Sequence, residues 1–324
     1  MQNPLPRRPN FFIVGQPKSG STALHNFLHA HPDIYMSPYK EPSYFCRDLH
    51  AESDAFHNKR IYFPIRTVDQ YAPLFEDARQ ETIVGESSVN YLYSKVAATE
   101  IHAYNPDAKI LMILRDPVDY LSSFYEMNVR RAWETASTLE EALLLEGKRE
   151  AGTSIPPNVG FPSTLFYRKR INYYDQARRF LDCFPTNHVK IVLYENFQKN
   201  NARVYHEILE FLGVDTSFQP EFRSVNASGA IRYPWLNTLV RNRFVIRLGY
   251  TLIPPSKHQL IQRWITKKLI TRSPTHRNID EALRARIINE ITPEVERTSS
   301  LVGENLLARW GFPPHSPDKS ANEG

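Results

Sequence analysis

Residues 10–28 of the chain read NFFIVGQPKSGSTALHNFL, and this stretch decides the fold. It begins with consecutive apolar residues, from Phe11 to Val14, which predict a short buried strand. The segment from Gly15 to Thr22 contains two glycines, and apolar residues then recur at helical spacing. In a strand–loop–helix unit of this kind, the loop N–H groups and the unpaired amides of the first helical turn point at one anion. The stretch therefore predicts a phosphate-binding loop.

The spacing within this loop is close to the phosphate loop of nucleoside triphosphatases, G-x-x-x-x-G-K-[ST]. Gly15 and Gly20 occupy the two glycine positions, and Thr22 occupies the final Ser/Thr position. Ser21 stands where the lysine belongs, and the lysine comes earlier, as Lys18. A lysine there would approach a terminal phosphate from within the loop, which disfavours ordinary ATP or GTP hydrolysis. A plain glycine turn between a core strand and a core helix is the alternative, but it does not require Lys, Ser and Thr together.

Length and composition indicate a globular protein. The 324 residues suffice for one large α/β core, and 41% hydrophobic and 23% charged residues are ordinary values. No apolar run approaches the roughly 20 residues that a membrane-spanning helix needs. The first ten residues lack the apolar stretch of a secretory signal, so a cytoplasmic location is expected. Cys46 and Cys183 do not make a disulfide framework, and both are expected to be buried free thiols.

The net charge of +5 conceals a local excess of basic residues. The region 225–279 holds ten Lys and Arg residues and no Asp or Glu, which leaves 30 basic against 35 acidic residues elsewhere. This basic region predicts contact with an anionic partner, and a peripheral contact with a membrane is one form that it could take. We expect it to form a helical cap on the substrate side, with helices at 235–252 and 259–270. The tail 313–324 is expected to be disordered.

Apolar and amphipathic segments alternate along the chain. This alternation predicts an α/β fold with three layers and a doubly wound, mostly parallel sheet, in a single domain over 1–312. Strands are expected at 11–14, 82–91, 108–114 and 189–194, and residues 31–37 are expected to form a turn that leads into a short strand. Helices are expected after residue 22 and at 94–104, 138–151, 166–184, 202–212 and 279–307.

A second anion-binding pattern follows the strongest strand, 108–114. The strand runs into RDPVDYLSSFY, where Asp116 is a good helix N-cap and Pro117 suits the first helical position. Arg115 then lies at the carboxyl end of the strand, and Ser123 lies about two turns into the helix. Ligands of open parallel sheets bind outside those strand ends, and an arginine with a hydroxyl suits a phosphate monoester. Alone, the pattern could equally be a salt bridge and a helix serine.

Three further candidates lie near the loop. Lys40 and Glu41 form a charged pair in the proline-flanked segment PYKEPSYF, which cannot be a regular helix interior. The pair is either a site for chemistry or a solvated turn. His25 and His29 are four residues apart on the first helix, but no third metal ligand lies nearby in the sequence. We therefore expect these histidines to face solvent or the edge of the substrate, and we expect no metal site.

Several motifs together resemble one family. PKSGSTAL, residues 17–24, is similar to the 5′-phosphosulfate loop of sulfotransferases that use 3′-phosphoadenosine 5′-phosphosulfate (PAPS), in their bacterial and glycan-type branch. ILRDPVDYLSSFY matches the family's 3′-phosphate motif, and KEPSYF is similar to the segment that carries its catalytic glutamate. GESSVNYLYS resembles a family strand, with Val89 where the family usually has proline, and residues 290–310 resemble the closing helices.

The resemblance implies an activity and a set of roles. The chain would transfer a sulfuryl group from PAPS to a hydroxyl or amine of a glycan, a lipid or a small molecule, and adenosine 3′,5′-bisphosphate (PAP) would be the product. Glu41 would be the general base, and Lys18 would stabilise charge on the leaving oxygen, without a metal. The implied nucleotide contacts are Lys18, Ser19, Gly20, Ser21 and Thr22 for the 5′-phosphate, Arg115 and Ser123 for the 3′-phosphate, and Tyr167 and Arg232 as further contacts.

Two other functions are compatible with the residues alone. A phosphotransferase acting on a small molecule or a nucleoside would also need a phosphate loop, but the displaced lysine argues against it. A non-catalytic module could bind an anionic surface through the region 225–279. No nucleic-acid-binding motif is present, so no nucleic-acid partner is expected. The acceptor and the oligomeric state stay open.

Overall fold

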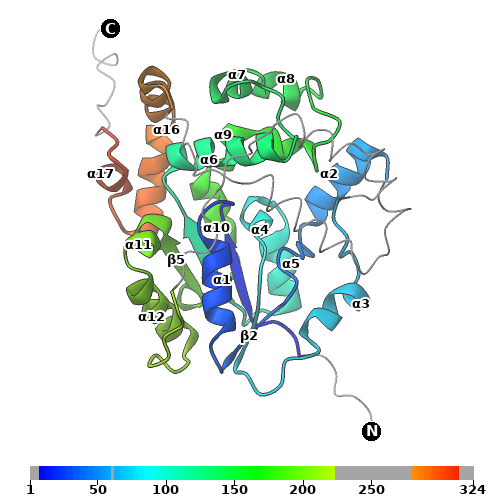
Figure 1. The fold of residues 1–324 in the computed structure, drawn as a ribbon, viewed down its shortest axis with the longest axis vertical. Coiled ribbons are helices and arrows are strands. Elements are labelled where there is room, and N and C mark those ends of the chain that lie inside the picture. Colours follow the sequence, from blue (N-terminus) through cyan, green and yellow to red (C-terminus); the bar gives the residue numbers. More distant parts are fainter. Residues whose placement is uncertain (1–6, 60–61, 223–278, 314–324) are drawn as a thin grey trace.

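The computed structural model describes residues 7–59, 62–222 and 279–313. Its centre is a five-stranded sheet in which every neighbouring pair of strands is parallel, in the order β2-β3-β1-β4-β5 (Figure 1). The predicted α/β class with a parallel sheet is therefore confirmed. The strands are β1 (Phe11–Gly15), β2 (Ile34–Met36), β3 (Ile83–Ser87), β4 (Lys109–Leu114) and β5 (Val189–Leu193).

Strand β1 lies in the middle of the sheet, between β3 and β4, and all five of its residues are buried. Two glycines, Gly15 on β1 and Gly85 on β3, allow close packing around this strand. A side chain at Gly15 would bring its Cβ to 2.7 Å from the carbonyl oxygen of Ile113 on β4. A side chain at Gly85 on β3 would come equally close to the ring of Phe11. Gly15 therefore excludes every larger residue unless β1 and β4 move apart, whereas a larger residue at Gly85 requires neighbouring side chains to shift.

Helices cover both faces of the sheet and make the outer two of its three layers (Figure 1). Phe11 and Ile13 pack with α1 (Ser21–His29) and α12 (Asn201–Leu212), whereas Phe12 and Val14 face the opposite, larger cluster. Alternation along one strand thus feeds two separate cores, as expected of a strand covered on both sides.

The larger cluster contains most of the remaining helices. Its main contributors are α5 (Ala97–Tyr104), α6 (Pro117–Arg130), α10 (Tyr173–Cys183) and α16 (Glu281–Val302). The other described elements are α2 (Arg47–His57), α3 (Val68–Tyr71), η1 (Ala72–Phe75), α4 (Asn90–Tyr93), α7 (Leu139–Leu144), α8 (Glu146–Glu150), η2 (Pro162–Leu165), α9 (Tyr167–Arg170), η3 (Thr186–His188), α11 (Tyr194–Lys199) and α17 (Leu306–Trp310).

Local capping residues behave as the sequence predicts. The Asp116 carboxylate accepts hydrogen bonds from the N–H groups of Val118 and Asp119, at 2.8 and 3.0 Å, and so begins α6. Gly213 ends α12 in the left-handed conformation. These caps fix where α6 begins, and α6 carries one of the predicted anion contacts.

The long helix expected at 166–184 is wrong, because the chain breaks between α9 and α10. Asn172 has non-helical dihedral angles at the start of α10. The amide of Gln176 donates to the carbonyls of Lys169 and Arg170, and the amide of Gln16 also donates to the Arg170 carbonyl. Side chains thus satisfy the end of α9, so the helix does not have to continue. The helix expected at 138–151 is likewise divided, at Leu145, into α7 and α8.

Other expectations are corrected or fall outside the described residues. Both cysteines are free, but only Cys46 is buried, since Cys183 is partly exposed. The region 225–278, with its two expected helices, and residues 314–324 lie outside the described residues, so the single domain over 1–312 stays a prediction. Within 7–59, 62–222 and 279–313, no helix combines the length and the apolar character needed to cross a bilayer.

Candidate functional site

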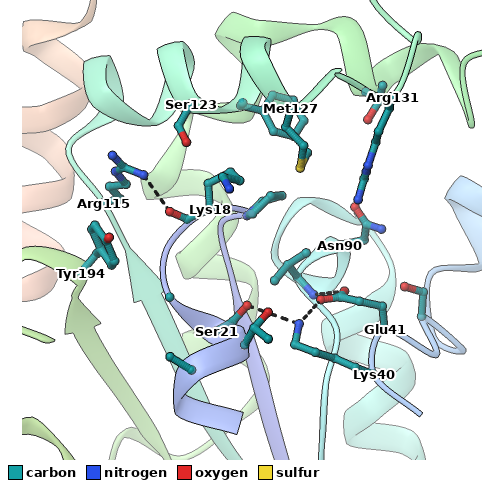
Figure 2. Close-up of a pocket in the computed structure, with 18 of the residues that line it drawn as sticks. Lys18, Ser21, Lys40, Glu41, Asn90, Arg115, Ser123, Met127, Arg131 and Tyr194 are labelled. Carbon is teal, nitrogen blue, oxygen red and sulfur yellow. Dashed lines mark hydrogen bonds and ion pairs between the residues drawn. The ribbon is translucent and has the colours of Figure 1, made fainter. Parts of the chain in front are cut away.

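A pocket of about 860 Å³ opens at the carboxyl ends of the parallel strands (Figure 2). The segments that leave β1, β3, β4 and β5 all contribute lining residues, as ligand sites in open parallel sheets require. Its volume lies within the usual range for small-molecule and cofactor sites. Of the residues predicted for the site, Lys18, Gly20, Ser21, Thr22, Glu41, Arg115 and Ser123 line this pocket.

The loop after β1 has the geometry of an anion cradle. Lys18 adopts a left-handed backbone, with φ of 67°, and Gly20 does so at the N-cap of α1, with φ of 79°. A Cβ at Gly20 would lie 3.2 Å from the rings of Phe197 and Tyr194. This tight turn places Ser21 at the first position of α1, where unpaired amides and the helix dipole attract negative charge.

Arg115, from the second predicted anion-binding pattern, contacts the loop directly. The Arg115 guanidinium donates from Nη1 to the carbonyl of Lys18, at 2.8 Å, and lies 4.8 Å from the centre of the Tyr194 ring. Ser123, on α6, lines the same pocket, and Figure 2 shows it on the same side of Lys18 as Arg115. The two predicted phosphate-binding groups therefore face one cavity, which one bisphosphorylated molecule can occupy.

The electrostatic environment of Lys18 is strongly positive. Burial, together with the nearby guanidinium groups of Arg130, Arg115 and Arg131, lowers the pKa of its amine to about 8, while Glu126 opposes this shift. A cation that loses stability in this way gains most when an anion binds beside it. Lys18 is thus prepared for a negatively charged ligand.

Lys40 and Glu41 lie at the edge of this pocket, partly exposed and held by hydrogen bonds. Glu41 adopts φ of 64°, a left-handed conformation that is rare for a non-glycine residue. Its carboxylate binds the Lys40 amine at 2.5 Å and accepts the Val89 N–H at 2.8 Å. Lys40 also donates to the Ser21 hydroxyl, at 3.5 Å (Figure 2). A carboxylate is therefore linked to the phosphate loop through one lysine.

His25 is not exposed to solvent, contrary to the sequence prediction. It is buried, with Nδ1 2.8 Å from the Ser87 hydroxyl at the end of β3. Burial, with a smaller contribution from Lys40, lowers the pKa of His25 to about 4. The ring is therefore neutral at physiological pH and ties α1 to β3. Within the part of the chain that the structure describes, no group of three His, Cys, Asp or Glu side chains could hold a metal ion.

Three predicted contacts are not placed in the pocket. Tyr167 is fully buried, its hydroxyl donates to Glu134 at 2.8 Å, and it does not line the pocket, so its nucleotide contact stays a prediction. The Ser19 side chain is fully buried, and its hydroxyl has no hydrogen-bond partner within the described residues. Arg232 lies outside the described residues.

Sequence reasoning missed several residues that line the pocket. Tyr194 follows the carboxyl end of β5 as Arg115 follows that of β4, and this position was a usable signal. Arg131 and Trp133 come from the turn after α6, and Tyr62 comes from an irregular segment. No local pattern marks these three, because contacts with distant segments place them.

Comparison with known proteins decides the family. The family model described as "Sulfotransferase family" matches residues 9–219, well over half of the chain. The chain belongs to the sulfotransferase family. The resemblance drawn from PKSGSTAL and RDPVDYLSS is thereby confirmed, and the phosphate-loop kinase is not favoured.

Several members of the sulfotransferase family are similar to this chain. The crystal structure of a sulfotransferase from Alicyclobacillus acidocaldarius shares 28% identity and a TM-score of 0.68, covering 94% of this chain and 99% of that one. Carbohydrate sulfotransferase 15 of Rattus norvegicus is 30% identical over 152 residues, which are 36% of this chain and 27% of that protein. Bifunctional heparan sulfate N-deacetylase/N-sulfotransferase 3 of Homo sapiens is 30% identical over 212 residues, 64% of this chain and 22% of that protein. The chain thus matches about a quarter of the length of these two relatives.

Proposed function

We propose that this chain transfers a sulfuryl group from PAPS to a hydroxyl or amine of a carbohydrate acceptor. The observation that carries the proposal is that three parts line one pocket: the loop at Lys18, the side chains of Arg115 and Ser123, and the Glu41 carboxylate. The names of the relatives, which act on carbohydrates or heparan sulfate, support the acceptor class.

The residues of the pocket fit a donor with phosphate groups at both ends. Ser21, Thr22 and the first amides of α1 would hold the 5′-phosphate, where the helix dipole favours negative charge. Arg115 and Ser123 would hold the 3′-phosphate on the other side of the loop. When bound, the donor supplies the sulfuryl group that passes to the acceptor and leaves PAP.

Two side chains would then carry the chemistry. Lys18 would neutralise the charge that develops on the leaving oxygen, a stabilisation worth most in a site shielded from water. Glu41 would take the proton from the acceptor as general base, a role worth about 10²–10⁴ in rate. The Lys40 amine and the Val89 N–H orient its carboxylate before the acceptor arrives.

Sulfur-labelled PAPS tests the proposal directly. We expect label to appear on at least one acceptor from a panel of glycans, lipids and phenols, with glycans preferred. Thermal stabilisation by PAP, and not by ATP with magnesium, would separate a sulfotransferase from a kinase. Transfer to phenols or lipids alone would contradict the carbohydrate acceptor, and stabilisation by ATP alone would contradict the donor.

Two variants assign the roles. Glu41→Gln is expected to lower turnover by about 10²–10⁴-fold while leaving PAP affinity unchanged. Arg115→Ala is expected to weaken PAP binding instead, since it removes a charged hydrogen-bond donor. Arg178→Gln, which removes an exposed ion pair with Asp182 on α10, is the matched control for both. Full turnover by Glu41→Gln would show that another group removes the proton.

A further inference from the structure

The turn after α6 holds strained backbone beside the pocket. Ala132 adopts φ of 55°, although it is not glycine. The N–H groups of Trp133 and Glu134 both donate to the Asn128 carbonyl, at 2.9 and 3.2 Å, and so close the turn. A left-handed conformation is unfavourable for a residue with a side chain, because its Cβ crowds the following carbonyl oxygen. Such strain persists where the surroundings enforce it, and it concentrates at functional sites.

A buried ion pair enforces this turn. Glu134 binds Arg149 through both carboxylate oxygens, at 2.5 and 2.8 Å, and both side chains are fully buried. The Tyr167 hydroxyl donates to the same carboxylate, at 2.8 Å. The Glu134 carboxylate also accepts the N–H groups of Thr135 and Ala136. The residue that ends the turn is therefore fixed from several directions.

The turn delivers two side chains to the pocket. Arg131 and Trp133 flank Ala132, and both line the cavity. The Arg131 guanidinium lies 4.8 Å from the centre of the Trp133 ring. Trp133 packs edge-on against Tyr62 at 5.1 Å, and a Cβ at Gly160 would come within 2.9 Å of it. The indole thus has a fixed place, and the guanidinium is stacked on it.

Arg131 has no acidic partner among the described residues, unlike Arg130, which pairs with Glu126. Figure 2 shows Arg131 pointing into the pocket toward Asn90, with Lys18 between it and the Arg115–Ser123 side. The phosphates of the proposed donor are already accounted for at Lys18, Arg115 and Ser123. The Arg131 guanidinium, which lies on the Glu41 side of the pocket, is therefore available to bind a different anion (Figure 2).

We propose that Arg131 and Trp133 form an oxyanion subsite for the acceptor, which binds a carboxylate or sulfate of an acidic saccharide while the indole packs against the saccharide ring. Guanidinium groups pair with carboxylates and sulfates through two parallel hydrogen bonds, and the stacked indole keeps the plane of the fork in place. This inference rests on the proposed function and narrows it, from any carbohydrate to an acidic one.

Calorimetry on the full chain saturated with PAP tests the oxyanion subsite without relying on turnover. The probes are a tetrasaccharide of alternating glucuronate and N-acetylglucosamine, its carboxyl-reduced counterpart, and that counterpart carrying O-sulfate groups. The unmodified chain is expected to bind at least one of the two anionic probes about tenfold or more tightly than the neutral one, the effect of one charged hydrogen-bonded pair. The better anionic probe identifies carboxylate or sulfate as the ligand.

Variants locate the preference. Arg131→Gln is expected to bind all three probes alike, with a much smaller change in PAP affinity than Arg115→Ala, whereas the control Arg178→Gln keeps the preference. Trp133→Leu is expected to weaken all three probes by a similar factor, because the ring carries no charge. Equal binding of the three probes by the unmodified chain, or a loss of PAP affinity in Arg131→Gln as large as in Arg115→Ala, would overturn the subsite.

Transfer of label from PAPS distinguishes a failure of the subsite from a failure of the proposed sulfuryl transfer. If Arg131→Gln removes the preference for anionic probes but no probe is ever sulfated, the subsite stands and the proposed reaction falls. If the neutral and anionic probes are sulfated with equal kcat/KM, the reaction stands and the subsite falls.

Discussion

The proposed nucleotide end of the pocket, around Lys18, Arg115 and Ser123, is built differently from the proposed acceptor end, around Glu41 and Arg131. At the nucleotide end, side chains follow directly from strand ends and helix starts, and their places are set by short-range caps and glycines. At the acceptor end, they sit on irregular turns that residues from other segments hold in place, the Val89 N–H at Glu41 and Arg149 of α8 at Glu134. One end therefore depends on the sheet, and the other depends on polar contacts between separate segments of the chain.

The largest expected effect breaks the support of the acceptor end. Glu134→Gln leaves the buried Arg149 without its counter-charge, and we expect it to lower the free energy of unfolding by about 3–5 kcal/mol, as measured by denaturant titration. Arg178→Gln, which removes an exposed ion pair with Asp182, is the control and should cost less than about 1 kcal/mol. Equal stability of the two variants would mean that the turn is held by other contacts.

The next effect concerns chemistry at the nucleotide end. Lys18→Met removes the positive charge beside the leaving oxygen, and we expect kcat to fall by about 10²–10³-fold in single-turnover assays. Lys169→Met, which removes an exposed pair with Glu150, should leave kcat unchanged. A change confined to KM would show that Lys18 binds the donor without stabilising the transition state.

A smaller effect follows from the lowered pKa of Lys18. The free protein loses the Lys18 proton above about pH 8, whereas a bound bisphosphate favours the charged amine and raises its pKa again. Binding therefore takes up a proton, and PAP affinity should fall by up to about tenfold per pH unit above pH 8. Calorimetry in buffers of different ionisation enthalpy measures this uptake. Affinity that stays constant to pH 9.5, or a similar decline in Lys18→Met, would contradict it.

The smallest expected effect tests whether Tyr167 supports the acceptor end, through Glu134, or contacts the nucleotide. Tyr167→Phe removes one hydrogen bond to Glu134, and we expect a loss of about 1 kcal/mol in unfolding free energy with PAP affinity unchanged. A clear loss of PAP affinity would instead restore the nucleotide contact that the family resemblance implied for Tyr167.

The same contrast explains what could be predicted from the sequence. Strand β1, the loop at Lys18, and the start of α6 at Asp116 were predicted because apolar runs, glycines and caps act over a few residues. The Arg115–Ser123 pair follows from them, since the strand and the helix place it.

The remainder depends on partners that are distant in sequence. His25 looked exposed because nothing near it in the chain reveals that Ser87 of β3 lies against its ring. The break between α9 and α10 depends on the side chain of Gln16, which lies 154 residues before Arg170 in the sequence. The place of Arg131 depends on the pairing of Glu134 with Arg149, and neither residue alone marks a binding site.

Gly15 fixes the distance between the loop that follows β1 and Arg115 at the end of β4. Because a Cβ there would strike the Ile113 carbonyl at 2.7 Å, no mutation at this position can be accepted without moving β1 away from β4, and with it the loop away from Arg115. Substitutions that keep the fold are therefore expected at other positions of the pocket. The side chains of Tyr62 and Trp133 line the pocket, so single substitutions there are expected to change the choice of the proposed acceptor while the distance between the two proposed phosphate-binding groups stays the same.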